Sequence, residues 1–135
     1  MDTLAGSIFY KIIQGDMPSH KVYEDEDFLV ILDIFPTNLG HCLVLPKVPA
    51  KDIFGLDEKT AEKLYPLAKK LALAVKKATA CDGINILQNN GKAAGQVVFY
   101  FHLHVMPRFY NEGAKNQFTD EKFAEMAAKI AENLT

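Results

Sequence analysis

Hydrophobic residues recur along this chain with two different periods, and each period predicts its own kind of element. Short stretches rich in apolar and β-branched residues, bounded by turn residues, predict strands. We expect them over His20–Glu24, Phe28–Ile34, His41–Pro46 and Ile84–Asn89, and a fifth strand that begins at Val98. Five short strands of this kind are typical of a sheet built from neighbouring segments.

Apolar positions at steps of three and four residues predict helices instead. A short helix is expected over Ser7–Gln14, a long one from Asp57 to about Ala80, and another over Thr119–Leu134. Because strands and helices do not alternate, the order favours an α+β fold. The prediction is a five-stranded antiparallel sheet with two main helices and a short N-terminal helix.

Length and charge narrow the class of protein. The chain has 135 residues and a formal net charge of -2, so we expect one domain over residues 1–135, with a core of about 7–108 and a C-terminal helix of about 119–134. No basic field suits nucleic acid, and no apolar run approaches the ~20 residues of a membrane span. Two isolated cysteines, Cys42 and Cys81, indicate reduced thiols. We expect a cytoplasmic protein that binds neither nucleic acid nor membrane.

The fifth predicted strand carries the candidate chemistry. Side chains alternate across a strand, so Tyr100, His102 and His104 share one face. The opposite face carries Phe99, Phe101, Leu103 and Val105. Two imidazoles on one face could attack a substrate, could hold a metal if further ligands joined them, or could be structural histidines beside a core. For the metal alternative, no further ligands can be named.

Other polar positions suit a ligand less specifically. Asp33 ends an apolar run, so its carboxylate either caps the following loop or faces a ligand. The loop from Asn89 to Gly95 is rich in glycine and could bring backbone amides close to an anion, although it lacks the P-loop pattern. His41 is interpreted as a structural histidine held by a local hydrogen bond.

Several of these segments together carry a resemblance. The run Gln96-Val-Val-Phe-Tyr100-Phe-His102-Leu-His104-Val, followed by Pro-Arg, resembles the signature of the histidine triad (HIT) superfamily, with Tyr100 in the place of the first histidine. The similarity covers the chain to about Arg108 and is greatest to the Hint-like branch. Its other landmarks here are Ile8-Phe-Tyr-Lys-Ile-Ile13, Tyr23-Glu-Asp25, Leu32-Asp-Ile34, Gly40-His41, Leu45-Pro-Lys47 and Gln88-Asn-Asn-Gly91.

The resemblance implies an enzyme without a cofactor. It assigns His102 as the nucleophile on the α-phosphorus of a nucleoside phosphoramidate or related purine nucleotide, with the backbone carbonyl of Tyr100 holding its far nitrogen. His104 and Gln96 would donate hydrogen bonds to the phosphate. The resemblance also implies a homodimer, paired through the long helix and the strand at 84–89. The implied nucleotide-binding residues are Asp33 for the ribose, Ile8, Phe9 and Ile12 for the base, and Asn89 and Gly95 in the phosphate loop.

Departures from the pattern support an alternative and a further expectation. Tyr100 replaces a histidine, and Val97 stands where Hint-like enzymes commonly have serine or threonine, so a nucleotide-binding regulatory module with little turnover is the second hypothesis. Some family members bind a structural zinc through four positions, which correspond here to Ser7, Tyr10, Pro49 and Tyr100. These side chains are poor zinc ligands. We therefore expect no structural zinc, and we expect Tyr10 and Tyr100 to be neighbours.

Overall fold

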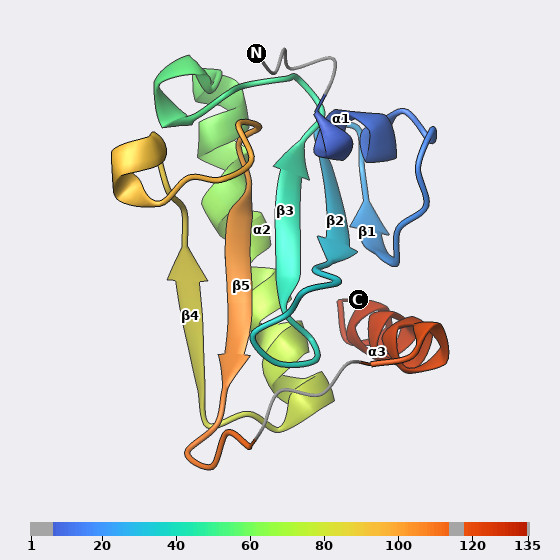
Figure 1. Cartoon of the computed structure of the whole chain (residues 1–135). Helices are drawn as coiled ribbons and strands as arrows, with labels where there is room; N and C mark the ends of the chain where they lie inside the picture. The colour runs from blue at the N-terminus through green and yellow to red at the C-terminus, as the bar shows by residue number, and fades with distance from the viewer. Residues whose placement is uncertain (1–6, 114–117, 135) are drawn as a thin grey trace.

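The strands form a single antiparallel sheet in the computed structural model, which describes residues 7–113 and 118–134 (Figure 1). The strand order is β1-β2-β3-β5-β4. Their bounds are β1 Lys21–Glu24, β2 Phe28–Leu32, β3 Cys42–Pro46, β4 Gly83–Leu87 and β5 Leu103–Arg108. The predicted α+β fold with a five-stranded antiparallel sheet is confirmed.

The central strands are buried on both faces. Every residue of β2 and β3 is buried, and the two strands pair in continuous register, with Val30 opposite Val44. Alternation sends Val30 and Val44 into one apolar cluster and Leu29 and Leu45 into another. The sheet therefore separates two cores.

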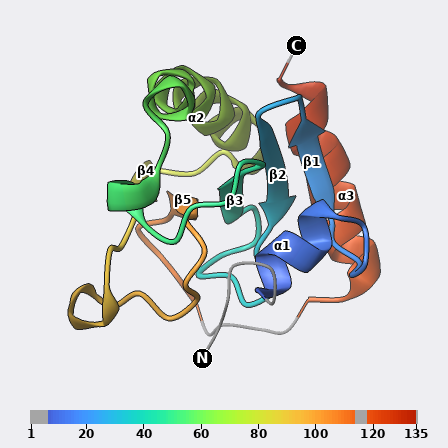
Figure 2. The ribbon, with the colours of Figure 1, turned by 90° about the horizontal axis from the view of Figure 1, so that it is seen from above.

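The larger core lies between the sheet and two helices, α2 (Glu58–Thr79) and α3 (Asp120–Glu132), as Figures 1 and 2 show. The helices present buried apolar residues at helical spacing: Leu67, Ala68, Leu71, Ala74, Val75 and Ala78 from α2, and Phe123, Ala127 and Ile130 from α3. The end of α2 packs closely on the loop before β3. A Cβ added at Gly40, where φ is +106°, would lie 2.8 Å from Cγ2 of Thr79, so only glycine fits there.

The opposite face of the sheet carries the short helix α1 (Ile8–Ile13), shown below the sheet in Figure 2. Ser7 caps it by accepting a hydrogen bond from the Phe9 amide. The second cluster gathers under this helix. It consists of Leu29, Ile31, Leu43, Leu45 and Tyr100, with Phe9, Tyr10, Ile12, Ile13 and Val98 packed against it.

Element bounds agree with the sequence to within one or two residues, with one exception. The strand predicted from Val98 begins at Leu103 instead. Before that residue the backbone bonds elsewhere, since the Phe101 amide donates to the Ala50 carbonyl and the Val98 carbonyl accepts from the Gln96 side chain. β-propensity alone could not reveal these loop partners. In the described residues no helix is long and apolar enough to cross a membrane.

Candidate functional site

His102 and His104 lie on the same face of the sheet, as the alternation predicts, although His102 precedes the strand. Their ring centroids are 4.9 Å apart, and the rings meet nearly edge to face. Leu103 lies between the two histidines in the chain and Val105 follows them, and both side chains pack in the larger core on the other face. The site is therefore built where one strand enters the sheet, with its histidines on the side that carries α1.

His102 is held by the main chain. Its Nδ1 lies 2.6 Å from the carbonyl oxygen of Tyr100, and its ring meets that of Phe9 edge to face at 5.0 Å. Burial lowers the pKa of His102, partly opposed by the Tyr100 carbonyl and the charge of Asp33. The imidazole is thus neutral near pH 7, and its side chain is fixed by α1 on one side and a backbone oxygen on the other.

His104 belongs to a second hydrogen-bonded group. Its Nδ1 lies 2.9 Å from Nε2 of His41, whose own Nδ1 accepts the Thr37 amide at 3.1 Å. The pKa of His104 is lowered to about 4, mainly by burial and also by the neighbouring histidines His102 and His41, while Asp33 opposes the shift. His104 is therefore neutral at pH 7 and poised as a hydrogen-bond donor or acceptor.

Asp33 caps the following loop, which is one of the two roles that the sequence left open. Its Oδ1 accepts a hydrogen bond from the Phe35 amide at 2.8 Å, which caps the loop after β2. Its Oδ2 lies 3.7 Å from Nε2 of His41. The carboxylate is partly exposed, so it closes the turn and also borders the histidine group.

His41 is the residue of this group whose part in the site the sequence interpretation missed. Its predicted local hydrogen bond exists, because the Thr37 amide donates to it, but the same ring also contacts His104. The pairing register explains the contact: Leu43 of β3 lies opposite His104 of β5, and His41 shares the parity of Leu43. Only knowledge of that strand pairing could have brought the two histidines together.

The loop before β5 is ordered by Gln96. Its side-chain oxygen accepts the Gly91 amide at 2.7 Å, and its nitrogen donates to the carbonyls of Lys51 and Val98. The residue is 3% exposed. Its described hydrogen bonds thus all go to backbone groups, whereas the sequence interpretation sent its amide to a phosphate. A side chain in a loop has no periodicity to predict its direction.

The remaining predicted ligand-binding residues border the same region. Ile8 is 43% exposed, whereas Phe9 and Ile12 are half-buried and pack on the smaller cluster. In the loop that was predicted to approach a phosphate, Gly95 has φ of +92°, and an added Cβ would lie 3.6 Å from the Asn89 side-chain nitrogen. The structure therefore brings Phe9 of α1 to His102, and brings Asn89 and Gly95 to each other.

The positions expected to have lost zinc ligands are held by other contacts. The rings of Tyr10 and Tyr100 lie 6.2 Å apart, which confirms that they are neighbours. Tyr100 is fully buried, and its hydroxyl donates to the Pro46 carbonyl. Ser7 caps α1. The chemistry of these three side chains is that of packing and hydrogen bonding.

A different trio, Asp33, His41 and His104, places its potential ligand atoms within 4.8 Å of one another. Two imidazole nitrogens on one tetrahedral zinc lie about 3.4 Å apart when each bond is about 2.0–2.1 Å. The nitrogens of His41 and His104 are 2.9 Å apart. In the structure this pair is therefore a hydrogen bond, and it would have to open before both rings could bind one ion.

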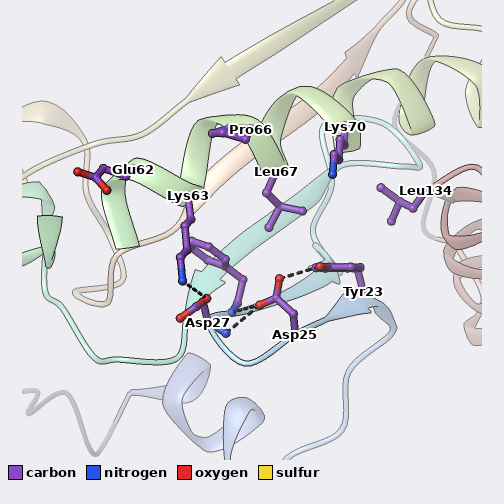
Figure 3. Close-up of a pocket in the computed structure, with 10 residues that line it drawn as sticks. Tyr23, Asp25, Asp27, Glu62, Lys63, Pro66, Leu67, Lys70 and Leu134 are labelled. Carbon is purple, nitrogen blue, oxygen red and sulfur yellow. Dashed lines mark hydrogen bonds and ion pairs between the residues drawn. The ribbon is translucent and has the colours of Figure 1, made fainter. Parts of the chain in front are cut away.

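A cavity of about 520 Å³ lies on the other side of the sheet, between α2, the β1–β2 turn and the end of α3 (Figure 3). Four of its polar groups form two pairs, since the Tyr23 hydroxyl donates to Asp25 and Lys63 pairs with Asp27. Leu67 and Phe28 in its wall belong to the larger core. Its lining includes none of the histidines of the site.

Comparison with known proteins places this arrangement in a family. Residues 14–111 match the HIT domain. An uncharacterised HIT-like protein of Borreliella burgdorferi is 41% identical over 94% of this chain and 97% of its own length. An adenosine 5′-monophosphoramidase of Schizosaccharomyces pombe is 42% identical over 75% of this chain and 73% of its own.

A solved structure gives the same result. The crystal structure of a HIT-like protein of Bartonella henselae, described as involved in cell-cycle regulation, superposes with a TM-score of 0.89. It is 36% identical and covers 96% of each chain. The similarity thus spans the sheet, the helices and the strand that carries the histidines. This chain belongs to the HIT domain family.

Proposed function

We propose that the protein is a nucleotidyl hydrolase or transferase that acts on the α-phosphate of nucleoside phosphoramidates or related purine nucleotides. His102 is its nucleophile, and the intermediate is a covalent nucleotidyl-histidine. The family and the monophosphoramidase among the relatives support the coarse activity. The finer assignment rests on the surroundings of His102.

The contact between His102 and the Tyr100 carbonyl carries this proposal. A carbonyl oxygen only accepts hydrogen bonds, so Nδ1 of His102 must hold the proton. With the pKa lowered, the ring is neutral near pH 7, and Nε2 then keeps its lone pair. This is the state that a nucleophilic imidazole requires. Because the acceptor is a main-chain group, tyrosine supplies it as well as histidine would.

The chemical steps then balance without a metal. Nε2 of His102 attacks the α-phosphorus, the bond from phosphorus to the leaving amine breaks, and the amine takes up a proton from solvent, which the attacking water of the second step gives back. Water next attacks the nucleotidyl-imidazole, which releases the nucleoside monophosphate and restores the neutral ring. His104 donates to a non-bridging oxygen, where negative charge develops. Gln96 acts as a positioning residue by fixing the loop amides.

The nucleoside would lie between α1 and the loop after β2. Asp33 is partly exposed beside the histidines and suits the ribose hydroxyls, while Ile8, Phe9 and Ile12 offer an apolar edge for the base. Asn89 and Gly95 would line the phosphate side. These are the ligand contacts that the family resemblance implied for the same residues.

We also propose a homodimer. The strand β4 is an edge strand and its apolar residues are exposed, with Ile86 at 38% and Leu87 at 43%. Two α2 residues, Tyr65 and Leu73, are also exposed, at 65% and 52%. An edge strand with apolar side chains invites pairing with a second copy. Light scattering at micromolar protein should give twice the chain mass, and a monomeric mass would contradict the dimer.

Intact-mass analysis after brief incubation with adenosine phosphoramidate tests the catalytic proposal. The wild-type chain should gain the mass of one adenylyl group and release adenosine monophosphate. His102→Ala should lose the adduct and at least about 10³-fold in turnover. His20→Ala is the matched control, because His20 stacks on Phe123 beside the helix face of the sheet and should keep both. Turnover of His102→Ala at the wild-type rate would overturn the assignment.

The same experiment separates the regulatory alternative. Val97 is 84% exposed and brings no hydroxyl to the loop before the histidines. A nucleotide-binding module would be stabilised by adenosine monophosphate in thermal unfolding but would form no adduct and turn over no phosphoramidate. That result would favour binding without catalysis.

A further inference from the structure

His41 occupies an unusual position for a histidine outside the motif strand. It is 4% exposed, and both of its ring nitrogens lie within hydrogen-bond distance of a described group. The Thr37 amide donates to Nδ1 at 3.1 Å, and Nε2 lies 2.9 Å from Nδ1 of His104. The ring thus connects the backbone of the loop after β2 to a histidine of β5.

The hydrogen bonds from Thr37 through His41 to His104 have a fixed donor direction, because the first group of the series is a backbone amide. A backbone amide can only donate, so Nδ1 of His41 must be the unprotonated nitrogen. In the neutral ring the proton is then on Nε2. That proton points to His104 at 2.9 Å in preference to Asp33 at 3.7 Å. Nδ1 of His104 accepts it, and the proton of the neutral His104 ring must be on Nε2.

His102, two residues before His104 in the chain, is held in the opposite tautomer. Its Nδ1 faces the Tyr100 carbonyl, an acceptor, so its proton is on Nδ1 and its Nε2 is bare. The two adjacent imidazoles are therefore held in opposite tautomers by two main-chain groups of opposite polarity. One presents a lone pair and the other presents an N–H.

We propose that His41 is a positioning residue that transmits the polarity of the Thr37 amide to His104 and holds it as the Nε2–H tautomer. This inference rests on the proposed function for its purpose, since an Nε2–H is what a phosphate oxygen requires. The tautomer itself is a property of the protein without substrate. The same polarity disfavours a metal on Nε2 of His41, because the ring would then carry its proton on Nδ1, against the Thr37 amide.

Nitrogen-15 NMR of the full chain with labelled histidine tests the tautomers directly at pH 7.5. His104 should show a protonated Nε2 and an unprotonated Nδ1, and His102 should show the reverse. His104 protonated at Nδ1, or averaging between both forms, would overturn the proposal. This readout needs no turnover, so it stands even if the protein proves to be a binding module.

Two substitutions of His41 distinguish the effect of its donated N–H from the effect of its side-chain volume. His41→Gln keeps an N–H near the position of Nε2, whereas His41→Leu removes it. We expect His41→Leu to lose the fixed His104 tautomer and about 10–100-fold in kcat/KM, the usual range for losing the partner that orients a functional imidazole. His41→Gln should keep the Nε2–H signature and lie within about threefold of wild type.

The control is His20→Gln, which removes a histidine from the helix face of the sheet and should change neither signal. Equal losses in the Gln and Leu variants, with the His104 tautomer unchanged in both, would assign His41 to packing and overturn its positioning role. The wild-type spectrum decides the tautomers even if the Leu variant does not fold.

Discussion

The two faces of the sheet carry different kinds of interior. On one face α2 and α3 close a large apolar core, in which Leu71, Val75 and Ile130 are fully buried. On the other face the short helix α1 covers a smaller cluster, and beside it lie three histidines, of which His102 and His104 are only partly buried. One strand, β5, serves both faces: Leu103 and Val105 point into the large core, and His104 points to the histidines.

The difference between the two faces shows how β5 contributes both to the stability of the fold and to the candidate site. A strand with one side fixed in a packed interior cannot shift without opening a cavity, so its other side is a rigid support for a site. The histidines lie on the face with less cover, where a ligand can reach them. Their protons are then directed by main-chain groups, the Tyr100 carbonyl and the Thr37 amide.

The largest effect on stability should come from truncating a side chain in the core between the sheet and the helices α2 and α3. Leu71→Ala removes a fully buried side chain and should lower the free energy of unfolding by about 2–5 kcal/mol. The kcat/KM of the folded fraction should stay near wild type, because no atom of the site is lost. Urea unfolding and turnover at low temperature measure the two quantities.

A matched change on the other face sharpens this contrast. Leu43 is 3% exposed and lies opposite His104 across the strand pair. Leu43→Ala should also destabilise the fold, and it should reduce kcat/KM because His104 loses its support. If both leucine variants kept full activity, or if both lost it equally, the inference that one face supplies stability and the other supports the site would be wrong.

The next effect concerns Asp33 at the edge of the open face. If Asp33 binds ribose, Asp33→Ala should weaken a ribonucleotide by about 1–3 kcal/mol, the range for losing a charged hydrogen-bond partner. A dideoxynucleotide should be weakened much less, since it has no hydroxyls to lose. Isothermal titration with the matched pair measures the difference. Equal losses for both nucleotides would assign Asp33 only to its turn with Phe35.

The histidine face should also respond to acid before the carboxylates do. The pKa of His104 is lowered to about 4 from 6.5, and that of His102 is lowered too. A histidine with a lowered folded pKa binds more protons when unfolded, so its stabilisation is complete above pH 6.5 and is lost as the pH falls toward 4. The neighbouring charges are His41 and Asp33.

Activity should fall over the same acid range, because protonated His102 has no lone pair. The midpoint of the kcat/KM profile should lie below 6.5. The lowered pKa values of Glu24 and Glu112, about 2 for each, belong to a separate window between 4.5 and 2. A kinetic midpoint at or above 6.5 would contradict the lowered pKa of His102, the proposed nucleophile.

Much of this architecture could be predicted because it depends on periodicity. The apolar stripe of α2 follows from its spacing, and β2 follows from a continuous apolar run. The alternation around His102 and His104 placed both on one face although β5 starts only at Leu103. The part of His41 in the site was missed, because it comes from the pairing of β3 with β5, which brings His41 to His104, 63 residues away along the chain. Gln96 was expected to donate to a phosphate, whereas its described hydrogen bonds go to backbone groups of the loop, because a loop side chain has no periodicity that predicts its direction.

The smallest effect should come from Tyr100, the residue that stands beneath the histidine site. Its hydroxyl donates to the Pro46 carbonyl, and its ring is fully buried near Tyr10. Tyr100→Phe should therefore cost about 1 kcal/mol of unfolding free energy, the net value of one hydrogen bond. The backbone carbonyl that holds His102 is unchanged, so kcat/KM should stay within about threefold of wild type. Tyr10→Phe is the control for a tyrosine hydroxyl outside this bond. A large loss of activity in a fully folded Tyr100→Phe protein would mean that the hydroxyl acts in the reaction, and that the residue does more than support the sheet beneath His102.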